Sequence, residues 1–416
     1  MAKKKEENRS LWGDAWRKLR QNKPAMVGLF IICFAVVISV LGANIRPDGT
    51  PDANDQHSPI AKLKPGSEID MLLVRKNEEV NKSGFFGKMF MGGSEVEYKK
   101  YPFLSYNIIG SEVIIEEYYK PGPMSSYEPS YKSYALPEVL YALDIEKDVK
   151  FNDLGNGTME IHLLNKEVIT KSIDEMKAEI ETNQIQKQRF FLGTDRHGRD
   201  FLSRIMSGTI ISLSVGLISV IISLVIGLIM GALAGYYRGW VDEAIMFVIN
   251  VIWSIPALLL IISVTLVVGK GFTTVFMAVG LIMWVDLARL VRGQVLSIRE
   301  KEYIEAGRAL GFNDFRIIRK HVLPNIIGPV IVQSANNFAT AILLEAGLSF
   351  LGIGTKIPMA SWGTVITTHQ GFITQPEYSF LAIIPGICII ILVFAFMLLG
   401  NGLRDAFDTK GIEVNV

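Results

Sequence analysis

Long uncharged apolar runs alternate with charged segments along this 416-residue chain. An apolar run of about 18 residues or more is long enough to cross a bilayer as a helix. Four runs reach this length without a charge, and two others contain polar or charged residues. The pattern therefore predicts six membrane spans: Pro24–Ala43, Ser207–Tyr237, Ala244–Gly269, Gly271–Leu290, Val322–Leu344 and Tyr378–Leu403.

Lysine and arginine gather in the segments on one side of these spans, which marks that side as cytoplasmic. Residues 1–23 and the loop 291–324 carry most of these charges, whereas the short loops on the other side offer only Lys270 and Lys356. We therefore predict that both termini, including a tail of residues 404–416, are cytoplasmic. The N-terminal segment also has one apolar helical face, which predicts an interfacial helix: Leu11, Trp12, Ala15, Trp16 and Leu19.

Residues 46–190, between the first two spans, are polar and far too many for a simple loop. Nine of the chain's 13 tyrosines lie between Tyr98 and Tyr141, which favours a folded body over a disordered linker. Partial alternation predicts a strand over Thr158–Thr170, and recurring isoleucines predict a helix over Ser172–Arg189. We expect a small extracytoplasmic α+β domain, with the tyrosines either on an interaction surface or in its core.

Three charges fall inside the predicted spans: Asp286, Arg289 and Glu345. A charged side chain at mid-membrane depth costs about 2.5–3.5 kcal/mol to insert, so it normally faces protein or water. Asp286 and Arg289 are three residues apart on a helix and can pair with each other. The pattern leaves open a pathway or gate and a salt bridge that steadies the helices. Prolines inside spans can also kink helices, and three occur: Pro256, Pro329 and Pro385.

Composition excludes several other classes of function. Half of the residues are hydrophobic, 20% are charged and the net charge is +1, so nothing points to nucleic acid. Cys33 and Cys388 both lie in apolar runs and form no disulfide framework. Gly84–Lys88 has part of a phosphate-binding loop pattern, but Met89 stands where a hydroxyl would hold Mg²⁺. We therefore predict no catalytic residue, no nucleotide site and no metal site, His197 included.

The stretch from Lys301 to Pro324 is charged and amphipathic and lies between two apolar runs. It predicts a short helix over Glu302–Leu310 that ends at Gly311, a residue that readily adopts positive φ. Asn313 is placed to cap a second helix. Pro324 then opens the fifth span, where its missing N–H does no harm.

The order of residues in this stretch resembles the cytoplasmic EAA loop of ABC importer permeases. Three residues separate Gly307 from Gly311 and nine separate Gly311 from His321, although Gly307 and His321 depart from the family's residue types. The resemblance implies that a separate ATPase moves the membrane helices through this loop. The residues expected to carry that coupling are Glu305, Ala306, Gly307, Arg308, Gly311, Phe312 and Pro324.

A second stretch, Phe191–Arg204, resembles the segment before the second span in the peptide/nickel subfamily of these permeases. We call residues 191–206 the outer collar. Its glycines and alternating charges predict a hydrogen-bonded, salt-bridged structure at the outer surface, formed by Gly193, Thr194, Asp195, Gly198, Arg199, Asp200 and Arg204. Residues 345–354, 361–363 and 403–405 also resemble this subfamily. The resemblance covers Leu11–Leu41 and Phe191–Lys410 and leaves out 46–190.

The resemblance implies an all-α polytopic membrane protein with six transmembrane helices in the type I ABC importer fold, plus the inserted extracytoplasmic α+β domain. The expected order is 1–23, a first span 24–45, the insert 46–190, the collar 191–206, a permease core 207–403 and the tail 404–416. Such a chain lies in a bacterial inner membrane and forms half of a translocation pathway for peptides.

The resemblance also implies partners: a second related permease, two cytoplasmic ATP-binding subunits, an extracytoplasmic substrate-binding protein and membrane lipid. ATP and Mg²⁺ are then expected on the partner ATPases, and this chain is neither an enzyme nor a cofactor carrier. Two alternatives remain open. One is an ion-driven secondary transporter that uses Asp286 and Glu345 as relays, and the other is nickel or another small solute as the substrate.

Overall fold

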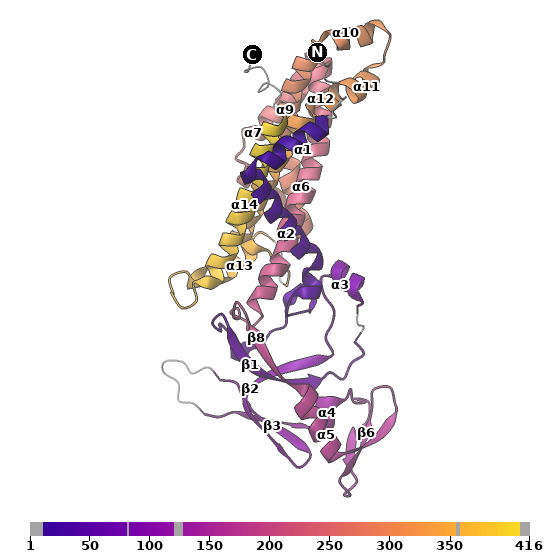
Figure 1. Ribbon diagram of the computed structural model, residues 1–416, viewed down its shortest axis with the longest axis vertical. Helices are drawn as coiled ribbons and strands as arrows, with labels where there is room; N and C mark the ends of the chain where they lie inside the picture. The colour runs from indigo at the N-terminus through magenta and orange to yellow at the C-terminus, as the bar shows by residue number, and fades with distance from the viewer. Residues whose placement is uncertain (1–10, 81–82, 120–127, 355–357, 408–416) are drawn as a thin grey trace, which may run out of the picture. The chain divides into compact units, whose positions relative to one another are not determined.

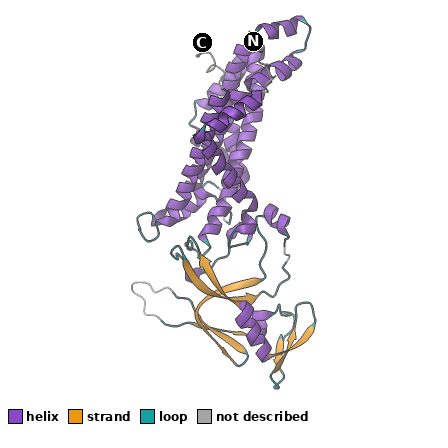
Figure 2. Ribbon diagram, in the orientation of Figure 1, coloured by secondary structure: helices purple, strands orange, loops and turns teal. Residues whose placement is uncertain are grey.

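The computed structural model describes residues 11–80, 83–119, 128–354 and 358–407. The chain divides into two compact units. We call the first the helical unit (Met1–Ser39, Gly208–Gly371 and Ala382–Val416) and the second the β-rich unit (Val40–Ser207 and Phe372–Leu381). Figure 1 and Figure 2 show long helices in the first and sheets in the second. Residues 1–10 of the N-terminal segment and 408–416 of the tail lie outside the described residues.

Among the described residues, five helices are long and apolar enough to cross a membrane. They are α2 (Lys23–Ile45), α6 (Phe201–Tyr237), α9 (Phe272–Arg299), the run Asp314–Phe350 that contains α11 (Asp314–Ile317) and α12 (Leu323–Phe350), and α14 (Phe380–Phe407). A sixth candidate is the bent pair α7 (Gly239–Trp253) and α8 (Ala257–Val268). The shorter helices of this unit are α1 (Leu11–Gln21), α10 (Glu302–Ala309) and α13 (Trp362–His369).

The predicted span Ala244–Gly269 corresponds to α7 and α8, which meet at an angle of 88°. Pro256 stands at the break as the N-cap of α8. Proline lacks the N–H that would continue α7, and it disfavours a helical conformation at the residue before it. Pro329 and Pro385, by contrast, lie inside the continuous helices α12 and α14.

Helix α1 forms over the predicted amphipathic stretch, but part of its apolar face packs on protein. Ala15 and Leu19 are buried in a cluster with Ala25 and Ala406. Trp16 remains 50% exposed. The packing is close because Gly402 of α14 has no side chain: a Cβ there would lie 2.2 Å from the Cβ of Ala25. Small residues of this kind let membrane helices approach one another.

The described residues of the β-rich unit form two antiparallel sheets. The larger has the order β4-β3-β2-β1-β8 and the smaller β5-β6-β7. The strands are β1 (Ser67–Arg75), β2 (Tyr98–Ile109), β3 (Glu112–Glu117), β4 (Tyr131–Ala135), β5 (Phe151–Asp153), β6 (Thr158–His162), β7 (Val168–Ser172) and β8 (Ile185–Phe190). Helices α3 (Phe85–Met91), α4 (Leu136–Leu140) and α5 (Ile173–Glu179) complete it. The main core joins β1–β3, α4, β6 and α5 through residues such as Leu72, Ile115, Leu136, Ile161 and Met176.

Two sequence-based boundaries in this unit are wrong. The single strand expected over Thr158–Thr170 is the hairpin β6–β7, which turns near Lys166 with φ +66°. The helix expected over Ser172–Arg189 stops after α5 and a π-helical turn, Ile180–Gln184. The chain then enters β8, where Ile185 pairs with Leu72 of β1. Tertiary pairing with β1 therefore overrides the helical spacing of the isoleucines.

The tyrosines divide between core and surface. Tyr101 and Tyr134 pack against the main core with ring centroids 5.1 Å apart. Burial, with Glu179 close by, raises the pKa of Tyr141 to about 12. Tyr106 and Tyr131 are 41% and 63% exposed. Some of the tyrosines therefore fill the core, and others lie exposed at the surface.

Candidate coupling site and outer collar

Helix α10 rests on the helical unit through its inner face. Ile304 is 1% exposed and belongs to a core cluster with Val295 of α9, Ile317 of α11 and Ile326 of α12. Gly311 ends the helix with φ +77°, and the Asn313 side chain accepts a hydrogen bond from the Arg316 N–H at 2.8 Å. These are the turn and the cap predicted from the sequence. Two short helices joined by a fixed turn can transmit a displacement, because neither slides freely on the core beneath.

The outer face of these helices carries both apolar and acidic groups. Tyr303, Leu310 and Phe315 are 46%, 74% and 70% exposed. Glu305 and Ala306 are exposed between them. We call these five residues the coupling face. Leu310 and Phe315 were not among the residues predicted from the sequence, although large apolar residues in a charged loop were a signal that could have found them.

Gly307 and Phe312, two of the residues predicted to carry coupling, do not belong to the coupling face. Gly307 is buried, and a Cβ there would lie 3.5 Å from the Phe312 ring. Phe312 is half-buried, with the Arg316 guanidinium 4.1 Å from its centroid and the His321 ring stacked at 6.2 Å. Both residues therefore shape the loop from within, whereas Arg308 and Pro324 are exposed.

Tyr236, at the end of α6, ties the loop to the membrane helices and was also missed. Its hydroxyl donates to Asp314 Oδ1 at 2.7 Å. The guanidinium groups of Arg308 and Arg299 lie 5.1 Å and 5.7 Å from its ring centroid. A cation over an aromatic face is attracted by the ring quadrupole. One side chain thus contacts α9, α10 and α11.

The chain runs from α11 into α12 without a gap, through a π-helical turn at Ile318–Val322. Pro324 lies in the first turn of α12, as predicted. Its ring would crowd the carbonyl four residues earlier in a regular helix. The wider π turn just before it removes that crowding. Helix α11 is therefore helically continuous with the fifth span.

Asp286 and Arg289 do not pair with each other; each binds α7 instead. The Trp253 indole N–H donates to Asp286 Oδ1 at 3.1 Å, and the Arg289 guanidinium lies 3.9 Å from the Trp253 ring centroid. Arg289 also donates to Asn250 Oδ1 at 3.3 Å. Two further links follow along the same helices: Arg292 with Asp242 and Arg238 with Glu300. These contacts connect α7 to α9 at both ends of α7.

Glu345 is only 1% exposed and faces protein. The Ser349 hydroxyl donates to its Oε1 at 2.7 Å and lies 3.4 Å from the hydroxyl of Ser361. Ser361 caps α13 by accepting from the Thr364 N–H at 3.1 Å. Glu345 therefore belongs to a polar network that joins α12 to α13.

A cavity of about 710 Å³ opens between α9, α12 and α14. Its polar lining comes from Gln294, Gln333, Asn336 and Arg404. Gln333 also donates to Asn337 Oδ1 at 2.9 Å, and Asn337 donates in turn to Ser223 of α6 at 3.3 Å. Of the amides that interrupt the fifth apolar run, Asn337 therefore joins α12 to α6, whereas Gln333 and Asn336 line the cavity.

The outer collar is built around a buried ion pair. Asp195 and Arg199 are 1% and 5% exposed at the side chain, with Arg199 Nη2 2.6 Å from Asp195 Oδ2. The other oxygen, Oδ1, accepts from the N–H groups of His197 and Arg199. Burial, together with the Arg199 charge, lowers the pKa of His197. Burial raises the pKa of Asp200, which accepts from the Ser203 N–H at 2.8 Å.

The collar packs tightly on the segment that follows the first span. Thr194 Oγ1 donates to the carbonyl of Ile60 and accepts from the Leu63 N–H at 2.8 Å. A Cβ at Gly198 would lie 1.8 Å from the His57 carbonyl oxygen, so only glycine fits there. Arg204 donates to the Asp52 carbonyl at 2.8 Å. Residues 48–66 and the collar therefore form one packed layer of the β-rich unit.

The chain is similar to known transport proteins. A glutathione transport system permease protein, GsiD of Pectobacterium atrosepticum, is 40% identical over 229 residues, which cover 55% of this chain and 75% of that protein. The family of binding-protein-dependent transport system inner membrane components matches residues 223–410. The chain belongs to this family. The permease also matches the N-terminal TM domain of oligopeptide transport permease C over residues 10–65.

Two further relatives of the permease have similar coverage. A dipeptide transport system permease protein, DppC of Alkalihalophilus pseudofirmus, is 39% identical over 53% of this chain and 72% of that protein. An oligopeptide transport system permease protein, OppC of Bacillus subtilis, is 38% identical over the same shares. The match over residues 10–65 corrects the sequence-based limit at Leu41, because it includes the segment that packs against the collar.

Family membership settles the class of function. The permease is a membrane-spanning transport subunit of an inner membrane, it works with an ATPase and a substrate-binding protein, and it is not itself an enzyme. ATP hydrolysis belongs to the partner ATPase. The same membership favours an ATP-driven importer over the ion-driven secondary transporter.

Proposed function

We propose that the permease forms one half of a translocation pathway for short peptides and pairs with a second, related permease. The relatives are named for dipeptides, oligopeptides and glutathione, which share peptide chemistry. Two cytoplasmic ATP-binding subunits, which hold ATP and Mg²⁺, would complete the assembly. The observation that carries this proposal is the coupling face: exposed apolar and acidic side chains on helices whose opposite side is locked into the membrane core.

Coupling follows from the contacts beneath that face. When an ATPase subunit pushes on Ala306 and Phe315, the load passes through Ile304 and Ile317 to α9 and α12. Tyr236 keeps α10 and α11 in register with α6 during the movement. Because α7 is linked to α9 through Arg292 and Arg289, the bent pair α7–α8 moves with it. Asp286 and Arg289 act here as links between helices and not as a relay.

The cavity between α9, α12 and α14 is our candidate for a stretch of the pathway. A peptide carries main-chain amides and a terminal carboxylate. Side-chain amides such as Gln333 and Asn336 can both donate and accept hydrogen bonds with amides, and a guanidinium such as Arg404 binds carboxylate. This polar lining suits many peptide sequences, because it recognises the main chain.

Orientation completes the proposal. The positive charges of residues 291–324, which we call the coupling loop, favour a cytoplasmic position for this loop and for both termini. The β-rich unit is then extracytoplasmic, on the side of the binding protein. Leu104, Tyr106, Ile109 and Tyr131 are exposed on or beside its larger sheet and are our candidate docking residues.

The experiment is reconstitution of the permease with its partner permease, ATPases and binding protein in proteoliposomes. We expect ATP-dependent uptake of labelled di- and oligopeptides. Glu305→Lys should reduce peptide-stimulated ATP hydrolysis about tenfold, since reversing an interface charge costs upward of about 1.4 kcal/mol. Glu305→Gln should retain most of the activity. Uptake of labelled nickel without uptake of peptide would overturn the peptide assignment, and normal stimulation in Glu305→Lys would overturn the coupling assignment.

A further inference from the structure

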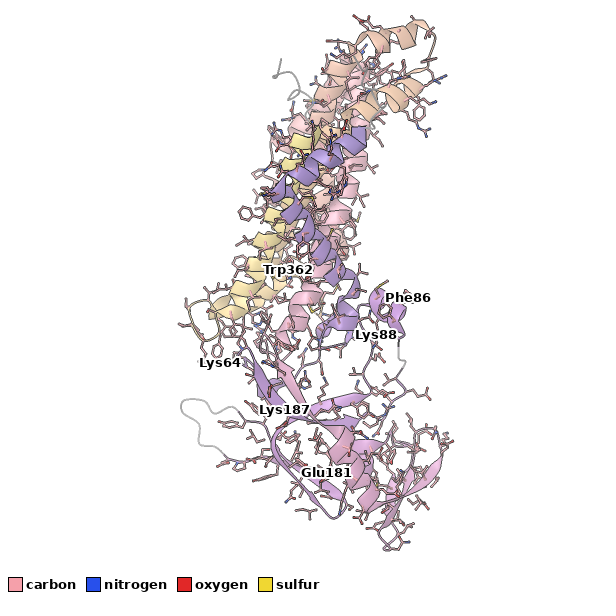
Figure 3. All side chains as sticks on the ribbon, viewed as in Figure 1. Lys64, Phe86, Lys88, Glu181, Lys187 and Trp362 are labelled. Atoms are coloured by element: carbon pink, nitrogen blue, oxygen red, sulfur yellow. The ribbon has the colours of Figure 1, made fainter. Side chains whose placement is uncertain are left out.

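Helix α3 presents an exposed aromatic face that the transport function does not use. Phe85 and Phe86 are 55% and 70% exposed, with ring centroids 5.5 Å apart in a T-shaped arrangement. Lys88 follows on the same helix, and Gly92 ends it with φ +69°. Figure 3 labels Phe86 and Lys88 on α3. Two large aromatic side chains in water on one short helix are unfavourable unless something covers them.

The position of α3 is fixed by contacts with the end of the first span. Asn44, in the last turn of α2, donates to the Phe85 carbonyl at 3.4 Å. Arg46, the first residue after α2, donates to the Gly92 carbonyl at 2.6 Å. Both ends of α3 are therefore hydrogen-bonded to residues at the C-terminal end of α2.

The residues just before and just after α3 are held by a second set of hydrogen bonds. The Ser83 N–H donates to Ser94 Oγ at 3.1 Å, and the Ser94 N–H donates to the Gly49 carbonyl at 2.9 Å. Arg46 is buried and donates also to the carbonyls of Asp48 and Thr50. The helix consequently has little freedom to lift away from the base of α2.

These ties set the depth of the aromatic face. Helix α2 has 23 residues and is about 35 Å long, at about 1.5 Å per residue. The hydrocarbon core is about 30 Å thick, and each headgroup layer adds about 5–7 Å. The last turn of α2 thus lies where hydrocarbon meets headgroups, and α3 is held at that level. Phenyl rings and a flexible lysine suit this boundary, since the lysine ammonium can reach lipid phosphates.

We propose that α3 is an interfacial anchor whose Phe85 and Phe86 insert into the adjoining lipid leaflet. The exposed apolar surface of α2 continues to the end of the helix next to α3, because Val40 and Ile45 are 44% and 58% exposed. The anchor would fix the distance of the β-rich unit from the bilayer. This inference rests on α2 crossing the membrane and does not depend on which substrate is transported.

The test is spin-label accessibility in the full-length permease, in nanodiscs of phosphatidylcholine and phosphatidylglycerol. Cys33→Ala and Cys388→Ala provide the background, and Phe86→Cys carries the label. Two matched sites are equally exposed: Phe34 of α2 at 58% as the lipid reference and Ile109 of β2 at 58% as the water reference. We expect oxygen to reach the Phe86 label as it reaches the Phe34 label, with little access for a water-soluble nickel chelate.

Two outcomes would overturn the anchor. A Phe86 label as open to the nickel chelate as the Ile109 label would place α3 in water. A label shielded from both reagents once the partner permease or binding protein is added, but open to the chelate without them, would assign the face to a protein partner. Phe85→Cys repeats the measurement in case Phe86→Cys does not assemble. Neither outcome bears on the proposed transport function, which the uptake experiment tests separately.

Discussion

Gly311 is the residue on which the geometry of the coupling loop depends most directly. Its φ of +77° is accessible to glycine and tolerable for asparagine, but a β-branched residue is strained there. We predict that Gly311→Val distorts the turn between α10 and α11 and abolishes most peptide-stimulated ATP hydrolysis in the reconstituted importer. Gly311→Asn, the matched control, should keep it. Full stimulation in the valine variant would show that the turn is dispensable.

The collar offers a residue-scale comparison between two buried aspartates. Asp195 is paired with Arg199, so Asp195→Asn leaves a buried guanidinium without its counter-charge. Breaking a buried pair in this way costs about 3–5 kcal/mol. Among the described residues no cation forms an ion pair with Asp200: its hydrogen bonds come from Ser203, and burial raises its pKa. Asp200→Asn keeps an acceptor for Ser203 and removes a charge that burial disfavours.

We therefore predict that Asp195→Asn unfolds the β-rich unit at much lower urea concentration, while Asp200→Asn raises the midpoint at neutral pH. For Asp200 the raised pKa means that its ionised form opposes folding, an effect that is absent at low pH and grows as pH rises through the folded pKa. Proteolysis of the full-length permease in nanodiscs, across a urea series, measures both midpoints. Equal midpoints for the two variants would contradict this account of the collar.

At the scale of elements, the coupling face should behave as a protein-binding surface. Leu310 and Phe315 project from α10 and α11 with no core contact of their own on the described chain. Large apolar residues of this kind often dominate binding, and truncating them typically costs about 2 kcal/mol or more. We predict that Leu310→Ala with Phe315→Ala weakens ATPase binding at least about tenfold. Ile109→Ala, at a residue of the other unit that is 58% exposed, should leave ATPase binding unchanged in a titration with purified ATPase.

The apolar runs made the membrane helices predictable, because a span is specified by length and hydropathy alone. The turn at Gly311 and the cap at Asn313 were predictable for a similar reason: each depends on a single residue type. Contacts between residues far apart in the sequence were not predictable. Asp286 has Trp253 as its partner and not Arg289, and β8 exists because β1 offers an edge. Local spacing contains no information about either neighbour.

Topology is a prediction about the whole molecule. In the cysteine-free background, Lys320→Cys lies in the coupling loop and Lys270→Cys in the short loop after α8. By the charge rule, an impermeant maleimide added to intact cells should label Lys270→Cys and leave Lys320→Cys unlabelled until the membrane is opened. The reverse labelling would invert the orientation and place the β-rich unit in the cytoplasm.

The sheets of the β-rich unit offer a natural place for a deletion, because the first strand begins where the last one ends. Ser67 and Phe190 are antiparallel neighbours, so residues 68–189 can be replaced by an Asn-Gly turn. This deletion retains His57, Ile60 and Leu63, on which the collar packs. We predict that the shortened permease still assembles with its ATPases, whereas transport or binding-protein affinity falls. Removing residues 50–188 instead takes away the collar's partners and should prevent assembly. A shortened permease that transports at the full rate, with unchanged binding-protein affinity, would show that the sheets do not dock the binding protein.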